Sequence, residues 1–273
     1  MSTSSHGSEA DHLARLNALL EEWVEEDKRL FPAHHYPGEM QRQCQESWER
    51  KANHMANMAR PLLHHFLRDN SDKTAEQLEE LAAHLSPGGA HTGGRLAYLI
   101  YKKGLAVDAL LLAALMRWNW GGGKMGFQFL PDPADADEDI EEYWFEAEDL
   151  IKFFQTATDG DPRRILTGND RAFYEWLPEK FTVYRGCSGI SFDIAWGGLC
   201  WTTKREVAEW FAWRGAPRRK PLVVTATKVS KCQIAFVKAS EYEIVVQPTR
   251  AREIKYRKHP EGWRPEMKWT LPA

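Results

Sequence analysis

The hydrophobic pattern of this chain changes its period near residue 165. Before that point, apolar residues recur every three or four positions, as at Leu16, Leu20 and Val24. This spacing is typical of amphipathic helices. After it, short runs rich in β-branched and aromatic residues alternate with turn residues, which is typical of strands. A chain that changes period in this way is expected to be an α+β protein.

The change of pattern predicts three segments. Residues 1–10 are polar and aperiodic, and we expect them to be a disordered tail. Residues 11–165 are expected to form a helical region, and residues 166–273 a C-terminal domain built on a mixed β-sheet. The N-terminus has no basic stretch followed by an apolar core, so we expect no secretory signal. No apolar run is long enough to span a bilayer, so we expect no membrane partner.

The individual elements follow from the same patterns and from the positions of Gly and Pro. Helices are expected over residues 11–30, 38–69, 71–85 and 95–118, in a stretch leading to residue 154, and over 170–176. Strands are expected at FTVYRG (181–186), GLCWTT (198–203), PLVVTATKV (221–229), CQIAFVK (232–238) and EYEIVV (241–246), with a helix over 204–214.

Charge is divided unevenly, although the net charge is only −3. Residues 181–273 hold 17 Lys and Arg against 8 Asp and Glu, and the remainder of the chain is correspondingly acidic. The basic part could attract an anionic partner, or the two parts could attract each other. The four cysteines are widely spaced, with no CxxC pair. This spacing favours reduced thiols in a cytoplasmic protein over a zinc site or a disulfide scaffold.

Two motifs place useful side chains at the ends of predicted strands. Arg185 and Gly186 end the first strand, in the sequence YRG. A guanidinium offers a rigid fork that suits phosphate, and glycine lets the backbone approach a ligand closely. Trp201, Thr202 and Thr203 end the second strand and lead into a helix. Their hydroxyls could orient neighbouring side chains, and Thr203 could cap the helix.

A third motif opens the last strand. Glu241 and Glu243 stand two positions apart, directly before the apolar run of residues 244–246. If both belong to the strand, they point to the same face, roughly 7 Å apart. Two carboxylates this close repel each other and raise each other's pKa, which gives a structural strand no advantage. A site that stabilises positive charge could use such a pair.

The ordered set of three motifs resembles the R-S-E class of mono-ADP-ribosyltransferases, the family of the clostridial binary toxins and the vertebrate arginine-modifying ectoenzymes. The resemblance covers residues 181–248, about a quarter of the chain. It rests on YRG at 184–186, on WTT at 201–203 followed by the apolar face of a helix, and on EYE at 241–243. The family has serines where this chain has threonines.

The resemblance implies an enzyme that takes NAD⁺ as its substrate and needs no metal. The reaction would pass through an oxocarbenium-like centre, as in glycoside cleavage. Glu243 would stabilise that centre through a ribose hydroxyl, since a fixed opposite charge is often the largest catalytic contribution. Glu241 would polarise or deprotonate the incoming acceptor.

The remaining motif residues would bind the dinucleotide. By the same resemblance, Arg185 would hold the diphosphate and the Gly186 backbone would meet the nicotinamide amide. Either Thr202 or Thr203 would keep the catalytic glutamate in position, and Trp201 belongs to the same expected NAD⁺ site. Which of Cys200, Trp201, Thr202 and Thr203 takes the family's serine roles stays open.

The acceptor of ADP-ribose has two alternatives. The Glu-x-Glu motif implies an arginine on a protein. Aromatic residues near the motifs, together with the basic loop 214–220 and the basic stretch 250–258, instead suit RNA or another single-stranded nucleic acid. An intracellular modifier of macromolecules endangers its host, so a toxin or phage-defence role with an inhibitor or antitoxin partner is plausible. A catalytically inactive NAD⁺- or nucleic-acid-binding module and an NAD⁺ glycohydrolase are the other functions that these residues allow.

Overall fold

The structure is a computed structural model that describes residues 8–30, 38–86, 90–120, 140–214, 220–257, 259–260, 262–267 and 269–270. The chain divides into two compact units, residues 1–127 and 128–273. The predicted boundary lay later, at residue 165. Most of the predicted tail lies outside the described residues, and the first helix begins at Glu9, within the last two residues assigned to that tail.

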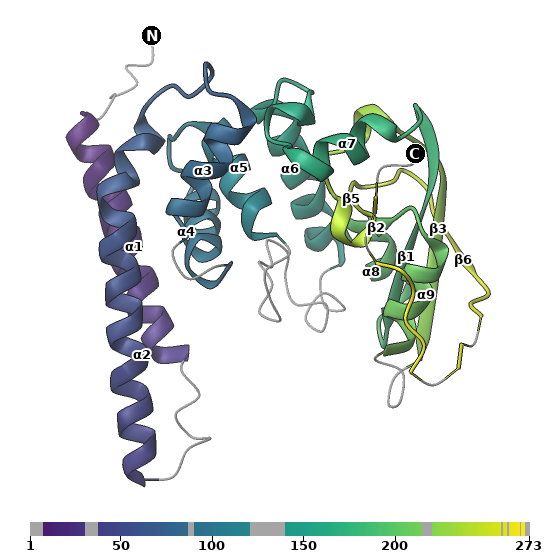
Figure 1. The fold of residues 1–273 in the computed structure, drawn as a ribbon, viewed down its shortest axis with the longest axis horizontal. Coiled ribbons are helices and arrows are strands. Elements are labelled where there is room, and N and C mark those ends of the chain that lie inside the picture. Colours follow the sequence, from purple (N-terminus) through teal and green to yellow (C-terminus); the bar gives the residue numbers. More distant parts are fainter. Residues whose placement is uncertain are drawn as a thin grey trace. The chain divides into compact units, whose positions relative to one another are not determined.

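The first unit is helical, as expected (Figure 1). Its elements are α1 (Glu9–Leu30), α2 (Gly38–Ala59), the 3₁₀ helix η2 (Arg60–Leu67), α3 (Ala75–His84), α4 (Ala90–Lys102) and α5 (Ala109–Asn119). Pro61 begins a new helix rather than kinking the old one, since it occupies the first turn of η2, where its missing N–H costs nothing.

The single helix expected over residues 95–118 is two helices, α4 and α5. Gly104 ends the first in a left-handed conformation, with φ of +60°, which glycine adopts without strain. Asp108 then starts the second as its N-cap, and its Oδ1 accepts a hydrogen bond of 2.7 Å from the Leu111 N–H. The continuous apolar pattern hid this break because both helices are buried.

The second unit contains a six-stranded sheet covered by helices (Figure 1). Its helices are α6 (Ile140–Ala157), η3 (Pro162–Arg164), α7 (Gly168–Trp176), α8 (Phe192–Gly197), α9 (Arg205–Arg214), η4 (Lys231–Gln233) and η5 (Ala239–Glu241). Its strands are β1 (Lys180–Ser188), β2 (Cys200–Thr202), β3 (Pro221–Ser230), β4 (Phe236–Lys238), β5 (Glu243–Val245) and β6 (Arg252–Ile254). The α+β class is therefore confirmed.

The strand order is β4-β5-β2-β1-β3-β6, and every described pair is antiparallel, where we expected a mixed sheet. The expected strand over 232–238 is shorter, because η4 occupies its first residues. Helix α6 belongs to this unit, and Phe154 on α6 packs against Phe236 on β4 with ring centroids 4.9 Å apart. Both rings are fully buried, and burying a Phe contributes about 1.5–3 kcal/mol.

Helix α9 lies directly on strand β1, at Gly186. A Cβ added to this glycine would stand 1.7 Å from the backbone oxygen of Ala208. The sequence interpretation assigned Gly186 to close approach of a ligand. The structure shows that the missing side chain also lets the backbones of α9 and β1 meet.

The C-terminal segment is fastened to α9 by the buried carboxylate of Glu209. Its Oε1 accepts hydrogen bonds from Arg205 Nε at 2.9 Å and from the Arg257 N–H at 3.1 Å. Its Oε2 accepts from His259 Nε2 at 2.9 Å, and that ring stacks on Trp263. A buried carboxylate is tolerated where it is paired and hydrogen-bonded in this way. Within the part of the chain that the structure describes, none of the helices has the length and apolar character needed to cross a bilayer.

Candidate active site

A cavity of about 280 Å³ in the second unit brings most of the predicted site residues together. Six of the seven predicted residues line it, and Thr203 is the exception. The lining residues are Tyr184, Arg185, Gly186, Cys200, Trp201, Thr202, Ala208, Phe211, Glu241 and Glu243. They come from β1, β2, α9, η5 and β5, so the sheet and one helix build the cavity together.

The cavity lies where β1 and β2 separate. Among the described residues these two strands pair at one position, Tyr184 opposite Thr202. Beyond it, the sheet opens, and the side chain of Arg185 spans the gap: its Nη1 donates a hydrogen bond of 2.7 Å to the Cys200 carbonyl. Gly198 makes room for this guanidinium, because a Cβ there would stand 2.3 Å from Arg185 Cζ.

The predicted place of Arg185 at a strand end is wrong. Strand β1 continues to Ser188, because its pairing with β3 continues to Ser188 opposite Pro221. The opening is on the β2 side alone. Arg185 therefore has one strand neighbour and one open side, which gives its side chain access to the cavity.

The predicted geometry of the acid pair is also wrong. Glu241 is the last residue of η5, and Glu243 is the first residue of β5. Tyr242 between them is left-handed, with φ of +51°, so the alternation of a strand and the expected spacing of roughly 7 Å do not apply. Both carboxylates nevertheless line the cavity, with Glu241 exposed and Glu243 half-buried.

The left-handed turn at Tyr242 is held by packing. Such a conformation costs a residue other than glycine about 1–2 kcal/mol. The Tyr242 ring is buried, lies edge-on to Phe173 at 6.0 Å between centroids, and has Lys204 Nζ 4.8 Å from its centroid. Burial raises the pKa of Tyr242, and the charge of Glu266 adds to that effect.

Two residues outside the predicted motifs hold η5 in place. Asp170 on α7 accepts a hydrogen bond of 2.8 Å at its Oδ1 from the Ala239 N–H. Trp269 donates its backbone N–H to the Ala239 carbonyl at 3.1 Å, and its ring packs on Phe173. Both are far from Ala239 in sequence, so no local pattern could have indicated them.

Thr202, rather than Thr203, contributes its hydroxyl to the site. Its Oγ1 donates to the Glu241 carbonyl at 3.3 Å and accepts from the Lys204 N–H at 3.2 Å, at the start of α9. Thr202 also stands opposite Glu243 in the pairing of β2 with β5. Thr203 binds through its backbone, donating its N–H to the Tyr242 carbonyl at 3.2 Å. Thr202 thus links Glu241 and Glu243 to the start of α9.

Aromatic side chains border the cavity on two sides. Trp201 is buried, and its indole N–H donates to the Gly198 carbonyl at 2.7 Å, which anchors the turn under Arg185. Phe211 on α9 was not predicted as a site residue, although it stands on the helix that follows the Thr pair. The Arg214 guanidinium lies 4.5 Å from the centroid of Phe211 and 5.0 Å from that of Trp210, an arrangement favoured by the cation–π interaction.

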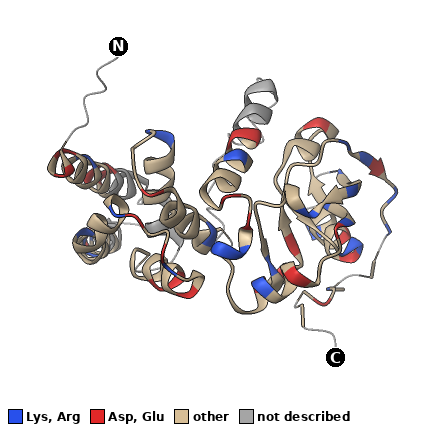
Figure 2. Ribbon diagram, turned by 90° about the horizontal axis from the view of Figure 1, so that it is seen from above, with Lys and Arg blue, Asp and Glu red and all other residues tan. Residues whose placement is uncertain are grey.

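The described side chains include no group of three or more His, Cys, Asp or Glu that could hold a metal ion. Figure 2 shows Lys and Arg along the C-terminal stretch around β6. In that stretch Arg252, Lys255 and Arg257 are exposed. Comparison with known proteins finds no matching family model, no matching curated protein and no matching solved structure.

Proposed function

We propose that this protein is an NAD⁺-dependent ADP-ribosyltransferase that modifies a macromolecule. The observation that carries the proposal is the shared cavity: Arg185, Thr202 and both glutamates come from separate elements and line one space. The resemblance of the motifs requires this convergence. A chance set of surface residues has no reason to converge on one cavity.

The proposed reaction breaks the bond between the ribose C1′ and the nicotinamide nitrogen. Nicotinamide leaves as a neutral molecule with the electron pair, and positive charge develops on the ribose. The half-buried carboxylate of Glu243 stabilises that charge more than an exposed one could, since burial lowers the effective dielectric. A nucleophile of the acceptor then attacks C1′, and Glu241, which is more exposed, accepts its proton.

The volume of the cavity limits what it holds. At about 280 Å³ it is at the small end of ligand sites, enough for the nicotinamide and its ribose. The diphosphate would lie at the opening, beside the guanidinium of Arg185, and the rest of the dinucleotide would extend outside. Phe211 supplies an apolar wall for a flat ring.

A reducing compartment fits this proposal. All four cysteines are free thiols, as is usual for proteins of reducing compartments. We therefore propose a cytoplasmic protein.

Hydrolysis of NAD⁺ without an acceptor is the second candidate. It is favoured by the exposure of Glu241, because an exposed carboxylate could activate water as well as a macromolecule. The two candidates share the first step and differ in the nucleophile.

Release of nicotinamide from NAD⁺ by the purified protein tests the proposal. Glu243→Gln is expected to reduce release by about 10²–10³-fold, the effect of removing one group that stabilises transition-state charge. Glu253→Gln, the same change at an exposed position on β6, is the control and should leave release unchanged. Equal release by the wild type and Glu243→Gln would refute the assignment. Labelled NAD⁺ with cell extract, followed by protease or nuclease, then separates transfer from hydrolysis.

A further inference from the structure

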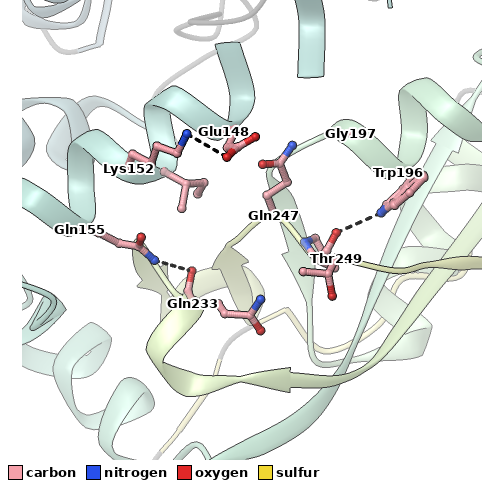
Figure 3. Close-up of a pocket in the computed structure, with 10 residues that line it drawn as sticks. Glu148, Lys152, Gln155, Trp196, Gly197, Gln233, Gln247 and Thr249 are labelled. Carbon is pink, nitrogen blue, oxygen red and sulfur yellow. Dashed lines mark hydrogen bonds and ion pairs between the residues drawn. The ribbon is translucent and has the colours of Figure 1, made fainter. Parts of the chain in front are cut away.

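A second cavity in the same unit takes no part in the proposed chemistry. Its volume is about 740 Å³ (Figure 3). It is lined by Glu148, Ile151, Lys152 and Gln155 from α6, by Trp196 and Gly197 from α8, and by Gln233, Gln247, Pro248 and Thr249. We call it the amide cavity, because three of its side chains are carboxamides.

The amide cavity lies at the far end of the strand pair that carries Glu243. The pair β2–β5 ends where the Val246 N–H donates to the Leu199 carbonyl at 3.0 Å. Residues 247–249 then enter the cavity wall. Gln247 follows Glu243 by four positions, which corresponds to about 13 Å along extended chain. A single extended ligand could reach from one cavity to the other.

The amide groups are arranged to present both a donor and an acceptor. Gln233 Oε1 accepts a hydrogen bond of 2.8 Å from the Ser230 N–H, which directs its Nε2 the other way. Gln155 Nε2 makes long contacts of 3.4 Å and 3.5 Å to the carbonyls of Cys232 and Gln233. Among the described residues, Gln155 Oε1 and Gln233 Nε2 have no hydrogen-bond partner. Figure 3 shows the Gln155 amide pointing at the backbone carbonyl of Gln233, with the Gln233 amide on the other side of that carbonyl.

The lining carries no excess charge. Lys152 and Glu148 pair with each other at 2.8 Å, and the indole N–H of Trp196 is already bonded to the Pro248 carbonyl at 3.0 Å. An anion would find no unpaired cation among the described lining residues, and an apolar ligand would offer no partner to Gln155 Oε1 or Gln233 Nε2. A neutral, planar ligand with adjacent donors and acceptors fits best.

A nucleobase has this chemistry. The edge of a base presents adjacent donor and acceptor atoms, which a glutamine amide can match, and unpaired bases are recognised in this way in single-stranded RNA. Arg250, which follows the cavity residue Thr249, is exposed and could contact the neighbouring phosphate. Phe211, which lines the first cavity, offers an aromatic ring for a further base.

We infer that the amide cavity binds an unpaired base of a single-stranded nucleic acid, and that this nucleic acid is the acceptor of ADP-ribose. Only the second part, that the nucleic acid accepts ADP-ribose, rests on the proposed function. Base binding could exist without transfer, and the test separates the two.

The probes are four fluorescent oligoribonucleotides of about 12 nucleotides, each of a single base, with binding followed by anisotropy at constant salt. The wild type is expected to prefer one base. Gln155→Leu and Gln233→Leu are expected to weaken binding of that oligonucleotide about tenfold, the value of one good amide–base contact, and to leave the other three unchanged. Gln45→Leu, the same change on an exposed glutamine of α2, is the control.

Nicotinamide release is measured on the same proteins. Unchanged release by Gln155→Leu and Gln233→Leu, together with loss of base preference, supports the inference. Binding without base preference, or an equal loss for all four oligonucleotides, overturns it. If nicotinamide is released but no oligonucleotide binds and labelled protein forms in extract, the acceptor is a protein. If base preference exists but no nicotinamide is released, the proposed function fails and the base site stands.

Discussion

The two sides of strand β1 differ sharply. On one side, β1 pairs with β3 over nearly its whole length, from Lys180 opposite Ser230 to Ser188 opposite Pro221. On the other side, β1 pairs with β2 at Tyr184 alone among the described positions. The first side is closed by backbone hydrogen bonds. The second side opens into the cavity of the candidate active site.

This difference explains where the polar residues of the motifs are found. The side chain of Arg185 reaches towards the open side and bonds to the Cys200 carbonyl. Two sets of contacts make β1 rigid: its backbone pairs with β3, and the contact of α9 with Gly186. Strand β1 thus has a structural edge, where it pairs with β3, and a functional edge, where it opens towards β2. Substitutions that affect the fold of β1 and substitutions that affect its open side should have different consequences.

Gly186→Ala should have the largest effect, because it breaks the contact between β1 and α9. The new Cβ would stand 1.7 Å from the Ala208 carbonyl oxygen, and a helix backbone cannot move aside as a side chain can. We expect unfolding free energy to fall by about 3 kcal/mol, at the upper end for overpacking. Urea denaturation measures this change in unfolding free energy. An unchanged midpoint would show that α9 is not fixed on β1 as described.

Glu241→Ala tests the open side, where function and not stability should change. The side chain is exposed at the end of η5, so the unfolding free energy should stay within about 0.5 kcal/mol of wild type. Transfer to the acceptor should fall by about 100-fold, the usual contribution of a general base, while nicotinamide release falls less. Parallel assays of ADP-ribose transfer and of nicotinamide release measure the two effects. Equal losses in both would assign Glu241 to the first step.

Gly198→Ala distinguishes the two edges with the same chemical change as Gly186→Ala. The backbone of Gly198 has φ of −70° and ψ of 147°, which alanine adopts readily. Its Cβ would meet the mobile end of Arg185, 2.3 Å from Cζ, so the guanidinium moves and the fold stays. We expect KM for NAD⁺ to rise about tenfold, as for loss of a charged hydrogen bond.

A double-mutant cycle with Arg185→Lys checks that the effect of Gly198→Ala passes through the guanidinium. If it does, the double variant should be no worse than Arg185→Lys alone. Additive losses would mean that Gly198 acts on the site by another route.

Much of the sheet could be predicted from the sequence, because long elements carry a period. Strands β1 and β3 and helix α9 were expected within one or two residues of their observed bounds. Strand β6 and helix α8 were not expected, since elements of three and six residues are too short to show a pattern. The antiparallel pairing of the strands also could not be predicted from individual segments.

Six of the seven residues that the motifs named line one cavity, but the geometry of the acid pair was not predicted. The motifs named the side chains that line the cavity, whereas the left-handed Tyr242 has no signal in sequence and removed the supposed alternation of the two acids. The burial and pairing of Glu209 could not be predicted either, because two of its hydrogen-bond partners, Arg257 and His259, stand 48 and 50 residues away. A lone acid on a helix ordinarily indicates an exposed face.

The smallest predicted effect concerns Glu209, the buried carboxylate that fastens the C-terminal segment to α9. Burial by itself raises the pKa of this carboxyl, but hydrogen bonds from His259, Arg205 and the Arg257 N–H outweigh it, so the pKa lies below its usual 4.5. A depressed pKa stabilises the fold above the unfolded-state value, and this stabilisation is lost as the pH falls through the folded-state value.

Glu209→Gln should therefore lower the unfolding free energy at pH 7 by about 1 kcal/mol, the usual worth of a hydrogen bond. The gap to wild type should narrow as the pH falls from 4.5 through the lower folded-state pKa, because the wild-type carboxyl then becomes neutral as well. Urea denaturation across this pH range, with the exposed Glu206→Gln on the same helix as control, measures the gap. A gap that stays constant with pH would mean that Glu209 contributes through its shape and packing, and α9 would then be fixed to the C-terminal segment without its charge.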